Sequence, residues 1–395
     1  MEQGNNAKNT MLLVVVALAS LIVGYMIGSQ GASKDEAGAP TQSWLPLRKE
    51  TGTIKLGFVA PLTGDAATLG ENMRVAAQIA VDEINSKGGV KGRKIEVIYE
   101  DGKCNAKDAT SAGTKLLSVD KVIAIVGGTC SGETLAIAPL AEKAKTPLVS
   151  SSSTSPKVTD AGDYVFRFVA SDSYQGVYAA DYLTKTKGIK KIAILSCLND
   201  WCVGLHEVFK KQAEANGATI VADESFKTDT RDLRTQLTKV KAAQPEAIYF
   251  PSMTEGALVG FKQMKELGLK AFVLGGDGWD DPKIPNEGGA SVEGGQYTIA
   301  ANRNLPASFL DEMKKRNADK DLNTYSPRVY DIFNVLAGIM GTVGTNGEKI
   351  KDELYKVKGY QGIADEYSLD SNGDVEKANF IVKEFKEGKA VEVKQ

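Results

Sequence analysis

The stretch that most constrains the fold is residues 54–101, where a strand, a helix and a second strand follow one another closely. Residues 54–60 form an apolar run of strand type, and a turn-rich loop follows them. Apolar residues then recur at helical spacing, and two glycines end the helix before residues 94–100, which alternate as a strand. This βαβ pattern predicts a parallel sheet with a right-handed crossover. The apolar residues that recur at helical spacing are Val75, Ile79, Ala80 and Ile84.

Composition excludes several classes of function. The chain has 395 residues, which is enough for two domains, and 42% hydrophobic and 25% charged residues are typical of a soluble globular protein. A formal net charge of −2 gives no reason to expect a nucleic-acid partner. His206 is the single histidine, and the sequence has neither a phosphate-binding loop nor a zinc-protease or nucleophile-elbow motif. We therefore expect no cofactor, no metal and no enzymatic activity.

The N-terminus is a separate piece. Residues 11–27 form a continuous apolar run of about 17 residues, the short end of the range for a membrane span. It has no cysteine after it for lipid attachment and no clean small-x-small cleavage site, so we expect residues 1–28 to be an uncleaved anchor or a cleaved signal segment. Residues 29–52 have the composition of a flexible linker. Either interpretation places the rest of the chain in the periplasm or on the outer face of the cell membrane.

Beyond residue 101 the sequence keeps alternating apolar strands with amphipathic helices, pauses near Asp172, and then begins the same alternation again. Within the second alternation a helix is predicted at 203–216. The last third is more helical, with helices predicted at 307–316 and 326–343 and short strands at 367–369 and 380–385. The pattern predicts an α/β protein with two doubly wound parallel-sheet halves. Ligands of such sheets bind outside the carboxyl ends of the strands.

Four cysteines in an exported chain suggest disulfides. Cys197 and Cys202 are five residues apart, which is close enough for a small local loop. The remaining pair, Cys104 and Cys130, follows the second and third predicted strands, whose carboxyl ends share one edge of a parallel sheet. Free or zinc-bound thiolates are the alternative, although no C-x-x-C spacing is present.

The motifs PLTGDAATLG, DEINSKGGVKGRKIEV and EDGKC, together with the sequence as far as residue 395, resemble the periplasmic branched-chain amino-acid-binding proteins, the solute receptors of ABC importers. The resemblance implies a type I periplasmic binding protein, in which a three-strand hinge joins two lobes. It assigns residues 53–172 and 301–364 to lobe 1, and residues 173–300 and 365–395 to lobe 2. It also implies a disulfide between Cys104 and Cys130.

Two turns of the first half are candidate sites for the ligand's head group. The first is the glycine-rich turn at 127–134, where Cys130 and Ser131 begin a helix whose N-terminal N–H groups can bind an anion. Simple helix capping by Ser131 is the alternative; the resemblance matches Ser131 to the serine that holds the ligand carboxylate. The second is the serine run at 150–156, either a surface loop or, by the resemblance, a head-group contact through Ser153 and Thr154.

The second half contributes Asp277, which lies between glycines at the end of an apolar strand. A buried ammonium needs a charged partner, and the resemblance places an acidic residue here; a turn in which Asp277 bonds only its own backbone is the alternative. Trp201 replaces the family's usual tyrosine as the aromatic that covers the ligand, unless it is only an exposed loop residue. Leu69 and Met253 stand where the family often has an aromatic and a tyrosine, and both fit an aliphatic ligand.

The resulting hypothesis is a non-enzymatic, extracytoplasmic solute-binding protein that closes around a small neutral, aliphatic amino acid and delivers it to a membrane permease. We expect a monomer, attached to the membrane through residues 11–27 if these are not removed. The same transport role for urea or a short amide is one alternative, and an extracellular ligand sensor is another.

Overall fold

A computed structural model describes residues 52–317, 322–377 and 379–394. The predicted membrane segment at 11–27 and the linker after it lie outside these ranges. Within the described ranges, no helix combines the length and the apolar character that crossing a bilayer requires.

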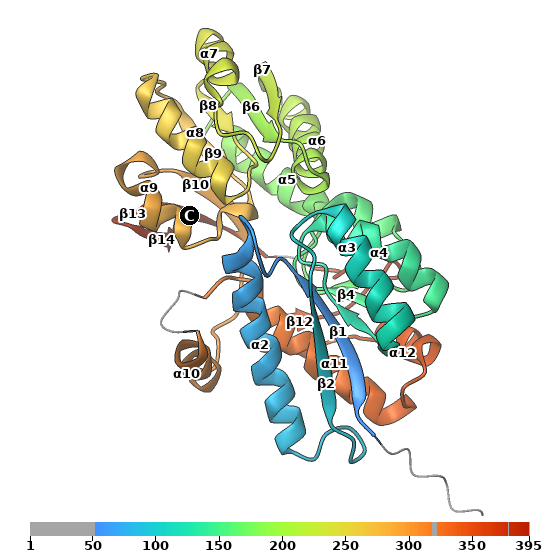
Figure 1. Cartoon of the computed structure of the whole chain (residues 1–395). Helices are drawn as coiled ribbons and strands as arrows, with labels where there is room; N and C mark the ends of the chain where they lie inside the picture. Colours follow the sequence, from blue (N-terminus) through green and yellow to red (C-terminus); the bar gives the residue numbers. More distant parts are fainter. Residues whose placement is uncertain (1–51, 318–321, 378, 395) are drawn as a thin grey trace, which may run out of the picture. The chain divides into compact units, whose positions relative to one another are not determined.

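The first sheet is entirely parallel, with the strand order β2-β1-β3-β4-β5. Figure 1 shows β1 and β2 side by side, with α2 beside them. Strand β1 lies inside this sheet, pairing with β2 on one side and β3 on the other, and α2 connects β1 to β2. The predicted parallel βαβ unit is therefore confirmed. The strands are β1 (Ile54–Ala60), β2 (Ile95–Asp101), β3 (Ile125–Val126), β4 (Leu148–Ser150) and β5 (Val165–Arg167).

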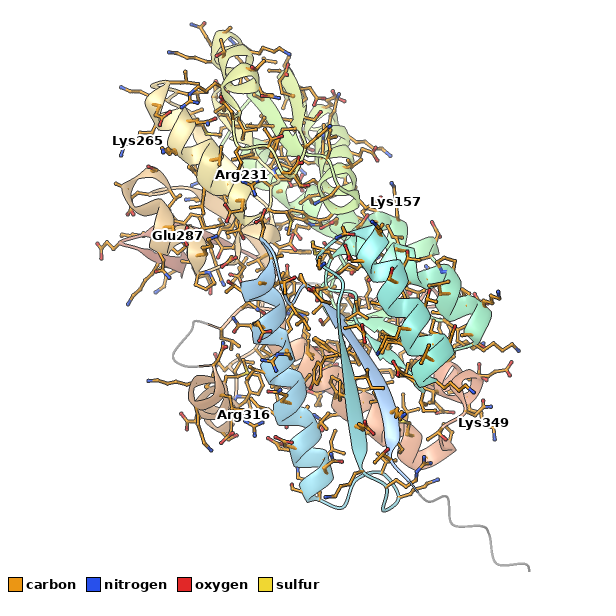
Figure 2. The ribbon with its side chains drawn as sticks, in the orientation of Figure 1. Lys157, Arg231, Lys265, Glu287, Arg316 and Lys349 are labelled. Carbon is orange, nitrogen blue, oxygen red and sulfur yellow. A yellow bond between two sulfur atoms is a disulfide. The ribbon has the colours of Figure 1, made fainter. Side chains whose placement is uncertain are left out.

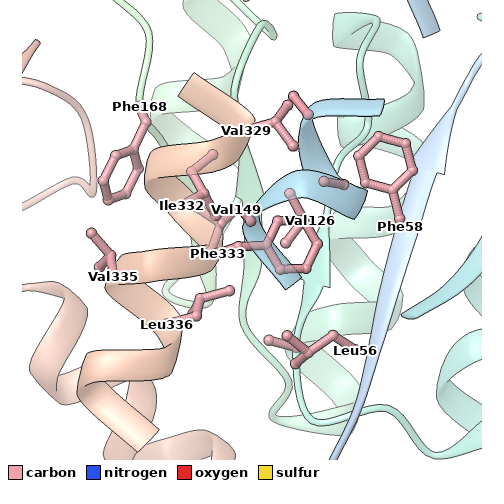
Figure 3. Packing of buried hydrophobic residues seen from close by; sticks show 14 of the residues in the cluster. Leu56, Phe58, Val126, Val149, Phe168, Val329, Ile332, Phe333, Val335 and Leu336 are labelled. Atoms are coloured by element: carbon pink, nitrogen blue, oxygen red, sulfur yellow. The ribbon is translucent and has the colours of Figure 1, made fainter. Parts of the chain in front are cut away.

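Helices cover both faces of this sheet, which explains why β1 is a continuous apolar run rather than an alternating one. Leu56 and Phe58 are buried in the first core, together with residues of α2 and α11 (Figure 3). Val59 points to the opposite face and is buried with residues of α3 and α4. The helices are α2 (Ala67–Ser86), α3 (Ala106–Thr114), α4 (Ser131–Ala144), α10 (Ala307–Arg316), α11 (Ser326–Val343) and α12 (Gly347–Leu354), with a π-helical turn η1 (Lys115–Asp120) and a 3₁₀ turn η2 (Pro156–Asp160).

The second sheet has the strand order β14-β13-β10-β9-β8-β6-β7 and encloses a separate buried cluster, the second core. Its strands from β7 to β10 are parallel, whereas β13 and β14 are antiparallel. The strands are β6 (Lys191–Cys197), β7 (Thr219–Phe226), β8 (Ala247–Tyr249), β9 (Phe272–Gly275), β10 (Gln296–Ala300), β13 (Phe380–Lys386) and β14 (Lys389–Glu392). The helices are α5 (Asp172–Asp181), α6 (Asp200–Ala215), α7 (Arg234–Ala242), α8 (Thr254–Glu266) and α9 (Lys283–Gly288), with the turns η3 (Tyr182–Thr186), η4 (Asp277–Trp279) and η5 (Gly289–Ser291).

The chain joins the second sheet later than the expected crossing near residue 365. Tyr367, Leu369 and Val375 are still buried in the first core, and β13 is the first segment after them in the second sheet. A short pair of antiparallel strands, β11 (Tyr360–Gln361) and β12 (Glu366–Tyr367), precedes the crossing. The Tyr367 hydroxyl donates to a buried carboxylate oxygen of Asp331 in α11 at 2.8 Å, which holds this segment against the first core.

Candidate ligand-binding cleft

The strand orders of the two sheets place the candidate residues. In an open α/β sheet, ligands bind where the strand order reverses, outside the carboxyl ends of the strands. The first sheet reverses between β1 and β3, and the second between β6 and β8. Leu69 and Ser131 follow β1 and β3, while Trp201 and Met253 follow β6 and β8. The reversal points of the two sheets thus supply four of the candidates.

A cavity of about 40 Å³ lies among these turns. Six of the residues that the sequence indicated line it together, so segments as far apart as Leu69 and Asp277 meet at one place. Ser153 and Thr154 are not part of the lining. The lining consists of Leu69, Thr129, Cys130, Ser131, Ser152, Trp201, Met253, Asp277, Gly278 and Tyr325.

Ser131 is the first residue of α4, and it is buried. Its hydroxyl oxygen accepts the backbone N–H of Ser155 at 3.1 Å and does not cap its own helix, so simple capping is not its role. The hydroxyl hydrogen remains free to donate into the cavity, beside the N-terminus of α4. This end of the cavity therefore combines a hydroxyl donor with the positive end of a helix dipole, a combination that suits a carboxylate.

The serine run is not a surface loop. Residues 150–155 are all buried, at no more than 8% exposure. The hydroxyl of Ser153 donates to the carbonyl of Gly128 at 2.9 Å and pairs with Thr134 at 2.7 Å, so its side chain is used inside the protein. The Thr154 hydroxyl is buried without a hydrogen-bond partner of normal geometry, and it lies close enough to Asp172 to lower the pKa of that carboxyl.

Asp277 lies in the 3₁₀ turn after β9, and its side chain accepts hydrogen bonds from two other side chains. Gln175 donates to one carboxylate oxygen at 3.0 Å, and the hydroxyl of Tyr325 donates to the other. Tyr325 belongs to the first core, at the start of α11, whereas Asp277 follows a strand of the second sheet. A contact between the two halves of the fold therefore runs through this carboxylate.

Sequence reasoning missed Asp172, Gln175 and Tyr325. Asp172 is fully buried, and neither of its carboxylate oxygens has a hydrogen-bond partner. Its position after an apolar strand, in the sequence ASDS, is a weak signal of the kind that singled out Asp277. Tyr325 gives no local signal, because it reaches Asp277 from 48 residues further along the chain.

Burial is the main cause of the raised pKa values of Asp277 and Asp172, which form the acidic end of the cavity. It raises the pKa of Asp277 to about 6, although hydrogen bonds from Tyr325 and Gln175 oppose the shift. Burial, followed by the charge of Asp277, raises the pKa of Asp172 well above its ordinary value. Burial and the charges of both carboxylates likewise raise the pKa of Tyr249, whose hydroxyl has no partner. The charge of Arg167 opposes the shift at Asp172, but this guanidinium is paired with Asp374. Two buried carboxylates without an ion pair form a site suited to an ammonium group.

Trp201 is 7% exposed, so it is not the exposed loop aromatic that was the alternative. Helix α6 begins at Asp200, earlier than residue 203 where the sequence placed it, because Asn199 caps it by accepting the N–H of Cys202 at 2.7 Å. Trp201 consequently lies in the first turn of a helix, where its backbone is fixed.

The structure contains both predicted disulfides, Cys104–Cys130 and Cys197–Cys202, with Cα–Cα distances of 5.2 and 5.4 Å. The Glu133 carboxylate accepts the backbone N–H groups of Cys104 and Cys130, each at 2.9 Å, and so fixes the backbone around the first disulfide. Among the described residues, no cluster of potential ligands could hold a metal ion.

Comparison with known proteins assigns the class. A family model described as "Periplasmic binding protein" matches residues 53–388, so the chain belongs to this family. The resemblance read from the sequence is confirmed, and the fold is that of a type I periplasmic binding protein with parallel sheets.

The names of individual relatives describe them as amino-acid-binding proteins. An "Amino acid binding protein" of Pseudomonas aeruginosa is 28% identical over 336 residues, covering 84% of this chain and 90% of that protein. The crystal structure of a leucine-binding protein from Thermotoga maritima has a TM-score of 0.81 at 28% identity, covering 87% of this chain and 98% of that one. A branched-chain amino-acid-binding protein from Streptococcus pneumoniae, solved with isoleucine, has a TM-score of 0.79 at 29% identity, covering 86% and 100%.

Proposed function

We propose that this protein is the extracytoplasmic solute-binding component of an ABC importer, and that it binds a small neutral amino acid with an aliphatic side chain. Its two lobes would be the parts that pack around the first and second cores. They would close on the ligand and present the closed form to the permease. Attachment to the membrane through residues 11–27 belongs to the same proposal.

The observation that supports this function most is the opposite chemistry of the two ends of the cavity. One end has a hydroxyl donor, Ser131, at the N-terminus of α4. The other has the buried carboxylate of Asp277, whose charge raises the pKa of the buried Asp172 nearby. An α-amino acid has the matching pair of charges on one carbon. Simple carboxylates, urea and amides lack the ammonium and would leave the two aspartates unpaired, which is costly in a buried site.

In the proposed complex, the ligand carboxylate accepts from Ser131. The hydroxyl of Thr154, which lies close enough to Asp172 to lower the pKa of that carboxyl, contacts the same head group. The ligand ammonium has three donors, and it donates to Asp277 and to the unpartnered oxygens of Asp172. The aliphatic side chain lies against Leu69, the ring of Trp201 and Met253, all of which line the cavity. The buried oxygens of Asp172, which lack hydrogen-bond partners in the free protein, then gain them.

Thermal-shift measurement on the full-length chain, followed by calorimetry, tests the proposal. The panel contains leucine, isoleucine, valine, alanine, phenylalanine, glutamate, urea and acetamide. It also contains 4-methylpentanoate and isoamylamine, which are leucine without its ammonium and leucine without its carboxylate. A ligand at 100 times its Kd stabilises by about 2.7 kcal/mol. We expect stabilisation by aliphatic amino acids alone. Equal binding of 4-methylpentanoate, or a response only to urea or acetamide, would contradict the ammonium site.

A further inference from the structure

The Cys197–Cys202 disulfide closes a short loop that contains Trp201, one of the residues that line the ligand cavity. It links the last residue of β6 to the first turn of α6, and Trp201 lies between the two cysteines in sequence. Both cysteines are at most 1% exposed. The N–H of Cys197 donates to the carbonyl of Pro251 at 3.1 Å, which links this end of the cross-link to the segment that leads to Met253. The cross-link is therefore an internal part of the cleft wall.

The ring of Trp201 packs on the turn that contains Asp277. A β-carbon at Gly278 would lie 2.6 Å from the ring, and one at Gly276 would lie 3.2 Å from it. Any larger residue at Gly278 would displace the tryptophan, so the glycine on the C-terminal side of Asp277 provides space for the indole. The fit between ring and turn holds only while the first turn of α6 keeps its position.

The indole N–H of Trp201 is buried and has no hydrogen-bond partner of normal geometry. It lies beside the Asp277 carboxylate, and Trp201 is one of the groups that lower the pKa of Asp277 against the effect of burial. A buried donor without a partner is unfavourable, so a small movement on ligand binding that pairs the Trp201 N–H with Asp277 would be favourable. Its orientation depends on the backbone that the disulfide fixes.

We propose that the Cys197–Cys202 disulfide is a specificity-determining brace, which holds Trp201 against the Gly276–Gly278 turn so that its ring limits the ligand side chain to aliphatic size and its N–H faces Asp277. Cys197 and Cys202 are positioning residues, since neither lines the cavity. This inference rests on the proposed amino-acid binding function. It assigns the ligand class to aliphatic rather than aromatic amino acids, because a braced indole cannot move aside for a second ring.

The test compares the full-length wild-type protein with C197A/C202A, and with C197S/C202S as a second variant of the same cross-link. Calorimetry gives Kd for leucine and phenylalanine. We expect the Kd for leucine to rise about tenfold. We expect the preference for leucine over phenylalanine to fall by about tenfold, the low end of the discrimination that one methylene gives in a hydrophobic pocket. Val240→Ala is the stability control, because Val240 is buried in the second core but lies in α7, away from the cavity lining. It lowers the melting temperature and leaves both Kd values unchanged.

A spectroscopic measurement separates positioning from stability and needs no ligand. The chain has three tryptophans, and ¹⁹F NMR of protein labelled with 5-fluorotryptophan gives each its own resonance. Trp201→Phe assigns the Trp201 line. We expect that line to broaden or shift in C197A/C202A, while the line of Trp279, whose N–H donates to Ser252 at 2.9 Å, stays unchanged.

An unchanged Trp201 line with unchanged leucine and phenylalanine affinities would overturn the inference. Failure of both double variants to fold would also contradict it, because a brace that only orients one turn is not required for folding. If the wild-type protein binds no amino acid at all, the proposed function fails, whereas the Trp201 resonance still reports whether the disulfide positions the ring.

Discussion

The negative charge of one side chain, Asp277, accounts for most of the ligand selectivity that we propose. Replacement of Asp277 by Asn keeps the size and the hydrogen-bonding capacity of the side chain and removes the charge that would pair with the ligand ammonium. Loss of a buried charge-assisted pair costs about 2–4 kcal/mol, which corresponds to a Kd for leucine about 30- to 800-fold weaker by calorimetry. Asp232→Asn is the matched control, since the Asp232 side chain is 64% exposed. Equal affinity in the two variants would disprove the head-group assignment.

The raised pKa values of the same carboxylates predict how binding depends on pH. In the free protein, burial holds the pKa of Asp277 at about 6 and raises that of Asp172. An ammonium ligand favours the ionised carboxylates and so lowers both pKa values. Leucine affinity should therefore rise with pH through about 6, and binding below that pH should release protons. The neighbouring tyrosines, Tyr249 and Tyr325, have pKa values raised well above 10 and do not titrate there; Arg167 is the nearby cation.

Calorimetry between pH 4.5 and 7.5, in pairs of buffers with different ionisation enthalpies, measures both the affinity and the number of protons released. In Asp277→Asn the pH dependence should be smaller. A flat affinity across this range, without proton release, would show that the two carboxylates are not at the ammonium.

At the scale of the element, the Cys104–Cys130 disulfide ties the loop after β2 to the N-terminus of α4. Its 26-residue separation in sequence means that it restricts the unfolded chain considerably. The double variant C104S/C130S should lose about 2–5 kcal/mol in free energy of unfolding, measured by chemical denaturation. Free thiols at these positions in the native wild-type protein, detected by alkylation and mass spectrometry, would refute the pairing.

Elements with a local signal were predictable from the sequence, and those defined by distant contacts were not. The apolar run of β1 and the helical spacing of α2 are local patterns, and both elements were found where expected. The start of α6 was placed late, because capping by Asn199 outweighs the turn-like sequence after it. The segment around Tyr367 was assigned to lobe 2, but Tyr367 is buried in the first core, where its bond to Asp331 spans 36 residues. Tyr325 was missed for the same reason: its partner is distant in sequence.

At the scale of the whole cleft, two ion pairs join segments that pack with different cores. Arg231, between β7 and α7, lies 2.5 Å from Asp65, which follows β1. Lys157, which follows β4, lies 3.1 Å from Asp200 at the start of α6; Figure 2 labels Arg231 and Lys157. All four side chains are between 41% and 60% exposed, so each pair contributes at most about 1 kcal/mol and is screened by salt. These contacts exist only while the two sides of the cleft touch. They should therefore stabilise the closed, ligand-bound state.

Removing both cations tests this role. R231A/K157A should bind leucine several-fold more weakly than wild type at 50 mM NaCl, and the difference should largely vanish at 500 mM, where the wild-type affinity falls towards that of the variant. K265A/K349A removes the same two charges from exposed positions elsewhere on the surface (Figure 2), and its affinity should match wild type at both salt concentrations. Because a zwitterionic ligand has no net charge, bulk salt acts on its encounter with the protein only weakly. A salt response that is the same in both double variants would mean that net charge, and not these two pairs, controls the closed state.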